Sequence, residues 1–255
     1  MTSFNEQLKK ISLIECLFVI ILSYALIYSL DFFNICKIDR GVVNILIILF
    51  FVFKLRNHIF ELKSDFHGIF SIIPLKEILV IIMLNIFFSY GMLYLSNYIV
   101  HSISVNDFFY FLISAKSIDD RLIGVFSLIS IVLISPITEE LLFRGIFLNK
   151  LRLIVPTIFA VLISALLFAS LHSFGSITSA FVFGICMALL YLKTDNILVP
   201  ILAHLLNNLI GETIYHLDYL ELLFTNCFVM AFMSVLAIVS FGIILKFFYS
   251  NLKNI

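Results

Sequence analysis

The chain has 255 residues, of which 62% are apolar, and its sixteen basic residues balance sixteen acidic ones. A mean hydropathy of +1.16 exceeds what a soluble core needs, so the composition excludes an ordinary soluble domain and predicts a polytopic membrane protein. A net charge of zero gives no reason to expect nucleic acid as a partner.

Apolar segments long enough to cross a bilayer, about 20 residues each, follow one another along the chain. They predict an all-α fold and one membrane domain, 1–255, with about eight transmembrane helices. The segments are 11–30, 41–60, 78–98, 122–149, 154–173, 177–192, 197–215 and 224–248. The first lacks a small-residue cleavage site, so we expect a retained helix rather than a signal peptide. Residues 104–115 predict an amphipathic piece at the membrane interface.

The fourth segment, 122–149, is longer than a span requires. It contains Pro136, which lacks a backbone N–H and predicts a kink.

Basic residues sort unequally between the two sides of this eight-span topology. Twelve of the sixteen fall on the side that carries both chain ends, and four fall on the other. The positive-inside rule therefore predicts that both termini are cytoplasmic and that the protein is integral to the cell membrane.

Charged residues interrupt the fourth segment in the sequence "TEELLFR", residues 138–144. A charge at membrane depth costs about 2.5–3.5 kcal/mol on insertion scales. Such a residue is therefore expected to have an oppositely charged partner or a functional role. Glu140 and Arg144 are four residues apart on one helix face and predict an ion pair. Glu139 lies about 100° round the helix and is left over for chemistry. The alternative is that all three residues form one structural network.

Two histidines also fall within apolar segments. In "FASLHS", Phe168 and His172 are four residues apart, and in "HLLNN", His204 and Asn208 have the same spacing. Each pair is expected to share a helix face, whereas Asn207 is expected to point elsewhere. Glu139, His172, His204 and Asn208 could then face one internal cavity.

Such a set has the chemistry for amide hydrolysis by activated water. A glutamate can act as general base on water and as general acid on the leaving amine, while imidazole and carboxamide N–H groups donate to an oxyanion. Glu139, His172 and His204 could instead bind Zn²⁺ with an open position. The sequence contains no HExxH, GxGD or GxSG motif, and it leaves the metal question open.

These three motifs, in this order, resemble the CAAX-protease and bacteriocin-processing (CPBP, Abi) family of intramembrane endopeptidases. The resemblance covers roughly residues 120–212 as a catalytic core. It implies an eight-helix membrane fold that cleaves membrane-associated peptides or proteins. Glu139 would activate water with help from His172, and His204 and Asn208 would stabilise the oxyanion. The supporting residues would be Glu140, Arg144 and Phe168.

The resemblance leaves the substrate open among prenylated CAAX proteins, bacteriocin or pheromone precursors and other membrane peptides, with bacteriocin self-immunity as a related role. No cofactor is expected, and zinc is the alternative. Two other functions also fit intramembrane carboxylates and histidines: a proton-coupled transporter, and a catalytically silent immunity or scaffold protein. One geometric difficulty remains, because straight, centred spans would separate Glu139 and His172 by roughly 15 Å in depth.

Overall fold

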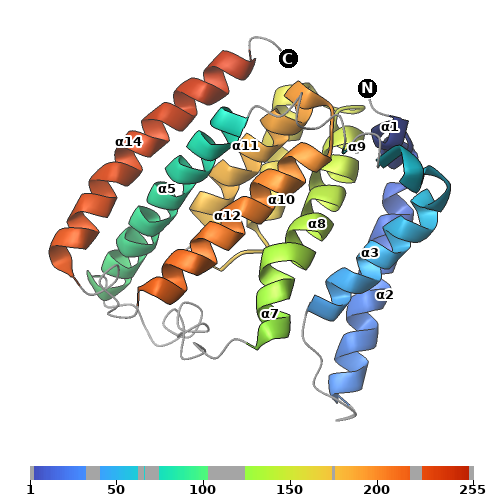
Figure 1. Ribbon diagram of the computed structural model, residues 1–255, viewed down its shortest axis with the longest axis horizontal. Coiled ribbons are helices and arrows are strands. Elements are labelled where there is room, and N and C mark those ends of the chain that lie inside the picture. Colours follow the sequence, from blue (N-terminus) through green and yellow to red (C-terminus); the bar gives the residue numbers. More distant parts are fainter. Residues whose placement is uncertain are drawn as a thin grey trace.

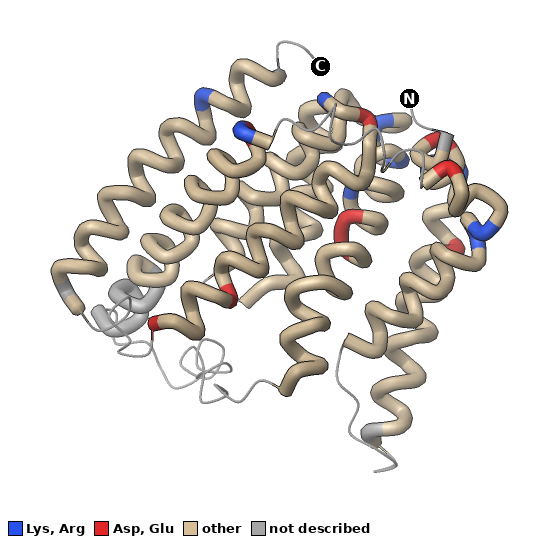
Figure 2. Tube along the Cα trace, in the orientation of Figure 1, with Lys and Arg blue, Asp and Glu red and all other residues tan. Residues whose placement is uncertain are grey.

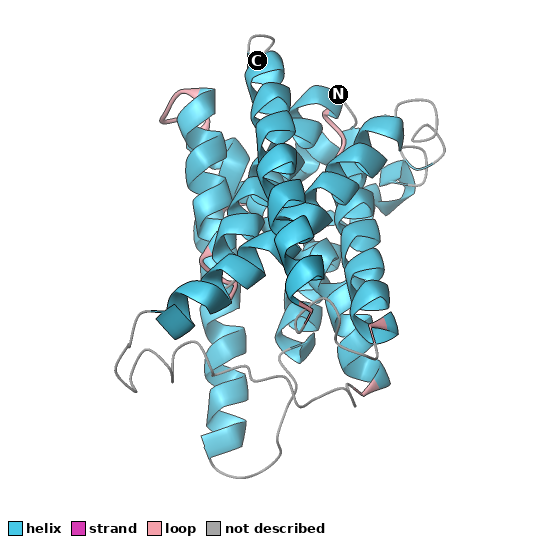
Figure 3. Cartoon of the chain, turned by 90° about the vertical axis from the view of Figure 1, so that its left-hand side faces the viewer, coloured by secondary structure: helices cyan, strands magenta, loops and turns pink. Residues whose placement is uncertain are grey.

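The structure is a computed structural model that describes residues 3–32, 41–62, 66, 75–102, 124–173, 176–218 and 226–252. These residues form helices and their connections, with no strand among them (Figure 3). In chain order the helices are α1 (Ser3–Lys10), α2 (Leu13–Phe32), α3 (Gly41–Leu55), the 3₁₀ turn η1 (Arg56–His58), α5 (Leu75–Ser102), the composite helix α7–α9, α10 (Thr157–Ala169), α11 (Ile177–Thr194), α12 (Leu198–Leu217) and α14 (Cys227–Leu252). The predicted amphipathic piece at 104–115 lies outside the described residues.

Each of the eight predicted apolar segments contains a helix, which confirms the all-α membrane fold. Among the described helices, six are long and apolar enough to cross a membrane. The other two predicted spans differ from expectation. Helix α10 has only 13 residues, and α12 has 20 residues but carries histidines, asparagines and a glutamate that lower its hydropathy.

The composite helix runs through Val125–Leu151 and changes its winding along the way. It consists of α7 (Val125–Ile129), the π-helical η2 (Ser130–Ile134), α8 (Ser135–Glu140), the π-helical η3 (Leu141–Leu148) and α9 (Asn149–Leu151). The disturbance predicted at Pro136 takes the form of this π-helical stretch. The Ser135 N–H donates to the Ser130 carbonyl, five residues back, as a π turn requires.

The short helix α10 resolves the predicted difference in depth. At 1.5 Å per residue, its 13 residues extend only about 20 Å, so its C-terminal end stops within the bundle. The turn that follows leads into α11, and Ser179 in the first turn of α11 accepts a hydrogen bond from Ser89 in the middle of α5, with Oγ atoms 3.3 Å apart. Helices α10 and α11 lie between α5 and α8 in the centre of the bundle (Figure 1).

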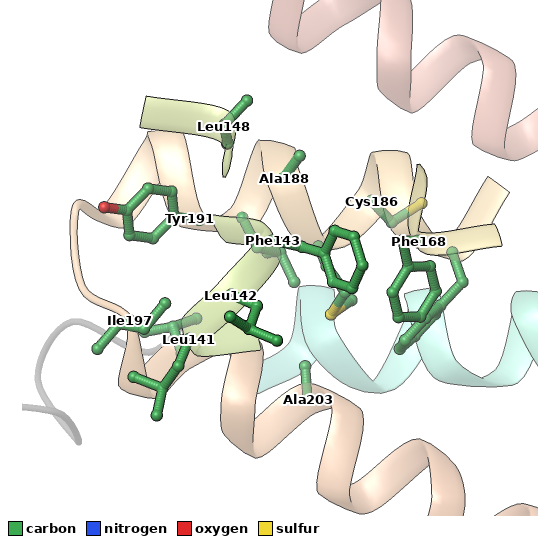
Figure 4. Packing of buried hydrophobic residues seen from close by; sticks show 14 of the residues in the cluster. Leu141, Leu142, Phe143, Leu148, Phe168, Cys186, Ala188, Tyr191, Ile197 and Ala203 are labelled. Atoms are coloured by element: carbon green, nitrogen blue, oxygen red, sulfur yellow. The ribbon is translucent and has the colours of Figure 1, made fainter. Parts of the chain in front are cut away.

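Close packing holds this central region together. Large apolar side chains of η3, α10, α11 and α12 interdigitate there (Figure 4), and the Phe143 and Phe168 rings meet edge to face at 5.5 Å. Gly184 of α11 faces Ala165 of α10, and a Cβ on Gly184 would lie 3.2 Å from that residue. Small residues at such crossings allow helix backbones to approach closely, which is how membrane helices gain packing energy.

Charged residues are distributed unevenly along the length of the bundle. Lysines and arginines gather toward the end that carries both chain termini, whereas the acidic pair of α8 lies midway along the helices (Figure 2). The two glutamates of α8 are therefore surrounded by apolar helices and must find polar partners there.

Candidate active site

The central feature of the site is a buried group of three charged or ionisable residues. Arg144 Nη1 donates to Glu140 Oε1 across 3.0 Å, and both side chains are almost fully buried. The second Arg144 terminal nitrogen donates to the Gly184 carbonyl across 2.9 Å. His204 Nδ1 lies 2.8 Å from the same Glu140 oxygen. The predicted ion pair between Glu140 and Arg144 is present, and it also holds α12 through His204.

These contacts specify how His204 is oriented. A carboxylate only accepts hydrogen bonds, so Nδ1 of His204 carries a proton and donates to Glu140. The other ring nitrogen, Nε2, then faces Glu139, whose Oε2 atom lies 3.8 Å away. Glu139 has 22% of its side chain exposed, whereas His204 has only 4%. The neighbouring glutamates therefore differ: Glu140 is enclosed by its partners, and Glu139 retains access to its surroundings.

His172 reaches the same region from the end of α10. The sequence predicted a histidine within a helix, but α10 ends at Ala169 and His172 lies in the turn that follows. The spacing to Phe168 still brings the two side chains together, because His172 Nδ1 lies 3.1 Å from the Phe168 carbonyl. The two rings are 4.8 Å apart. The Phe168 ring also contacts the His204 ring at 5.8 Å, so it separates and orients both imidazoles.

A polar cavity of about 140 Å³ opens beside these rings. Its walls come from α5, the α10–α11 hairpin and α12. The lining residues are Asn85, Ser89, Phe168, His172, Ser176, Ser179, Ala180, Phe183, His204, Asn207 and Asn208. Glu139 does not line this cavity and adjoins it through His204.

Three asparagines beside the cavity form a directional chain of hydrogen bonds. Asn85 Nδ2 donates to Asn207 Oδ1 across 3.0 Å, and Asn207 Nδ2 donates to Asn208 Oδ1 across 3.3 Å. Asn208 Nδ2 completes the chain by donating to the Ile131 carbonyl across 3.0 Å. These three hydrogen bonds therefore link α5 to α12 and α12 to the composite helix that carries Glu139.

Pro136 explains why the Ile131 carbonyl accepts a side-chain bond. The Ser135 N–H is directed to the Ser130 carbonyl. At π-helical spacing the next donor, for Ile131, would be residue 136, which is a proline and has no N–H. A buried carbonyl without a partner is costly, and Asn208 supplies the missing donor.

The structure places His172, His204 and Asn208 on one cavity. The expectation that Glu139 faces the same cavity is not met, because Glu139 adjoins it only through His204. Two further predictions need correction. The prediction that Asn207 points elsewhere is wrong, because a helix face includes residues three as well as four positions apart. The placement of His172 inside a helix is also wrong, as described above. Sequence reasoning missed Asn85 and Ser89, and the available signal was the presence of polar side chains within an otherwise apolar segment.

The alternative zinc site would need its three ligands gathered around one point. Within the described parts of the chain, no three His, Cys, Asp or Glu side chains are gathered as a metal site requires. The bond from His204 Nδ1 to Glu140 leaves Nε2 as the ring nitrogen that a metal could reach, so this bond does not itself exclude zinc. Because its members are not gathered, the set Glu139, His172 and His204 does not fit a three-ligand zinc site in this arrangement.

Comparisons with known proteins agree with the motifs. Residues 121–210 match the family model described as Type II CAAX prenyl endopeptidase Rce1-like. Neither the comparison with curated proteins nor that with solved structures gave a match. The matched residues contain Glu139, Glu140, Arg144, Phe168, His172, His204 and Asn208. Residues 121–210 are therefore similar to the Rce1-like CAAX prenyl endopeptidase family, as the motifs predict.

Proposed function

We propose that the protein is an intramembrane endopeptidase in which Glu139 activates water without a metal ion. The observation that carries the proposal is the 3.8 Å approach of Glu139 Oε2 to His204 Nε2, beside a Glu140–Arg144 pair that is already neutral. The charges of Glu140 and Arg144 neutralise one another, so neither charge needs Glu139. Glu139 is then the acidic group at this depth with no ion-pair partner other than an imidazole, and it is available for proton transfer.

The proposed reaction gives each of these residues one role. Glu139, assisted by His172, takes a proton from water, and the resulting hydroxide adds to the carbonyl carbon of the scissile peptide bond. The Asn208 carboxamide and a protonated His204 Nε2 donate to the oxyanion, which is favourable at a site surrounded by apolar helices. When the intermediate collapses, the C–N bond breaks and Glu139 returns its proton to the leaving amine.

The substrate class and the orientation are also proposals. The family description and the membrane-spanning helices support a membrane-associated peptide or protein as substrate, with prenylated CAAX ends as the first candidate and bacteriocin or pheromone precursors as the next. The gathering of basic residues at the end with both termini supports cytoplasmic termini in a cell membrane (Figure 2).

The test combines a defined peptide with an unbiased search. Purified protein in liposomes is given a farnesylated, internally quenched peptide with a CAAX end, and the peptides of host membranes are compared between cells with the wild-type chain and cells with Glu139→Gln. We expect either cleavage of the farnesylated peptide or accumulation of an uncut membrane peptide in the Glu139→Gln cells. A wild-type protein that produces neither result contradicts the proposal.

A further inference from the structure

Helix α5 lies outside the segment that matches the family model, yet it forms one wall of the polar cavity. Asn85 and Ser89 are four residues apart on α5 and both line the cavity. Ser89 Oγ donates to Ser179 Oγ across 3.3 Å, and Ser179 Oγ donates in turn to the Ser176 carbonyl. These contacts place α5 directly against the hairpin that carries His172.

Asn85 places a buried carboxamide in a mostly apolar helix. It is only 7% exposed and lies in a helix that is otherwise strongly apolar. Its Oδ1 atom is buried and has no hydrogen-bond partner among the described residues. A buried acceptor left in this state costs about 1–3 kcal/mol. A leucine at the same position would remove this unpaired acceptor but would leave Asn207 Oδ1 without its donor, so the carboxamide of Asn85 serves Asn207.

The hydrogen-bond chain shows what Asn85 does for the site. Asn85 Nδ2 points to Asn207 Oδ1, which fixes the orientation of the Asn207 amide and directs its Nδ2 toward Asn208 Oδ1. Asn208 is thereby held with its own Nδ2 toward the Ile131 carbonyl. An amide nitrogen carries two N–H groups, so one hydrogen bond to Ile131 leaves the second N–H of Asn208 for an oxygen in the cavity.

We infer that Asn85 is a positioning residue for peptide hydrolysis, acting through Asn207 to hold the Asn208 amide in the orientation that stabilises the oxyanion. This inference rests on the proposed function. It extends the site to a helix that the family match does not include. The effect of Asn85 is exerted on the transition state, because the oxyanion exists only there.

The test measures kcat and KM separately for Asn85→Leu, Asn207→Leu and the double variant. The substrate is the farnesylated CAAX peptide or, if the wild type leaves it intact, the membrane peptide that accumulates in Glu139→Gln cells. Removing an oxyanion donor outright costs about 10²–10³ in kcat, so its misorientation is expected to lower kcat by about tenfold with KM little changed. The kcat of the double variant is expected to match that of the single variants, because both substitutions break the same series of hydrogen bonds.

Asn44→Leu is the matched control. Asn44 Nδ2 donates to Ser135 Oγ across 2.8 Å, so this variant also removes an asparagine bond between two helices, but it lies outside the cavity. Its kcat is expected to stay close to the wild-type value. If Asn85→Leu does not insert, Asn85→Ser is used instead, because it is smaller and polar and its hydroxyl is too short to reach Asn207.

Two results would overturn the inference: a wild-type kcat for the Asn85 variant, or a double variant whose loss is the product of the single losses. These results are distinct from failure of the proposed function. If Glu139→Gln is inactive and the Asn85 variants are fully active, only the inference fails. If Glu139→Gln is itself fully active, the proposed function fails.

Discussion

Glu139 and His204 come from different helices, and their Oε2 and Nε2 atoms lie 3.8 Å apart in the interior of the bundle. The opposite side of the His204 ring is bonded to Glu140 across 2.8 Å. One imidazole thus connects a glutamate that is structurally enclosed with a glutamate that retains 22% exposure. The two neighbouring acids therefore have different environments.

Breaking the buried ion pair is expected to lower the free energy of unfolding. Glu140→Gln leaves the fully buried Arg144 guanidinium without a counter-charge, which costs about 3–5 kcal/mol. Thermal unfolding in detergent measures this loss. The control is Lys193→Met, which breaks the more exposed pair of Lys193 with Glu77 and is expected to cost at most about 1 kcal/mol. Equal losses for the two variants would contradict the structural role of the buried pair.

Pro136→Ala is expected to lower activity without lowering stability. Alanine restores an N–H that can bond the Ile131 carbonyl at π-helical spacing, and this bond competes with Asn208 Nδ2. The Asn208 amide then loses its fixed acceptor, so kcat is expected to fall while the unfolding temperature is unchanged or higher. A variant with wild-type kcat would show that the Ile131 carbonyl does not orient Asn208.

Gly91→Ala is expected to separate α5 from α14. The added Cβ would lie 2.4 Å from Ala237 Cβ and 2.9 Å from the Met233 carbonyl oxygen, so the helices must shift. Overpacking of this kind costs about 1–3 kcal/mol, measured by thermal unfolding. Gly242→Ala on α14 is the control, because its Cβ meets nothing within 4 Å. A loss of stability at Gly242 as large as that at Gly91 would contradict the packing described here.

Chelators are expected to leave cleavage unchanged. The residues that could hold zinc are not gathered into a three-ligand site in the described parts of the chain, and the proposed reaction moves protons through Glu139 without a metal ion. Activity is measured after prolonged incubation with 1,10-phenanthroline, with its non-chelating 1,7 isomer as the control. Loss of activity in the 1,10 isomer only, with recovery on adding Zn²⁺, would require a metal-dependent mechanism.

The sequence predicted much of the fold because the length of an apolar segment is enough to identify a membrane helix. It also predicted the ion pair of Glu140 with Arg144 correctly, since that pairing depends only on spacing within one helix. The end of α10 was not predictable in this way, because residues 154–173 are apolar over most of their length. The contact of the following helix, α11, with α5 is tertiary and was not predictable either. The length of α10 is what brings His172 to the depth of the cavity.

The asparagine chain shows a second limit of sequence reasoning. Asn85, Asn207 and Asn208 come from two helices, and their contact depends on which faces of α5 and α12 meet. No spacing rule within a single helix contains that information. The π-helical stretch at Ser130–Ile134 was likewise predicted only as a disturbance at Pro136, because the direction of the displaced carbonyl depends on the donor that Asn208 supplies.

The most direct test of the account is the kcat of Glu139→Gln on the cleaved substrate, measured beside Glu77→Gln. The amide keeps the size of the side chain and cannot accept a proton from water, so kcat is expected to fall by about 10²–10⁴ while the protein inserts and unfolds as the wild type does. Glu77 is paired with Lys193, and its variant should keep wild-type kcat. Cleavage by Glu139→Gln at the wild-type rate would contradict the central claim.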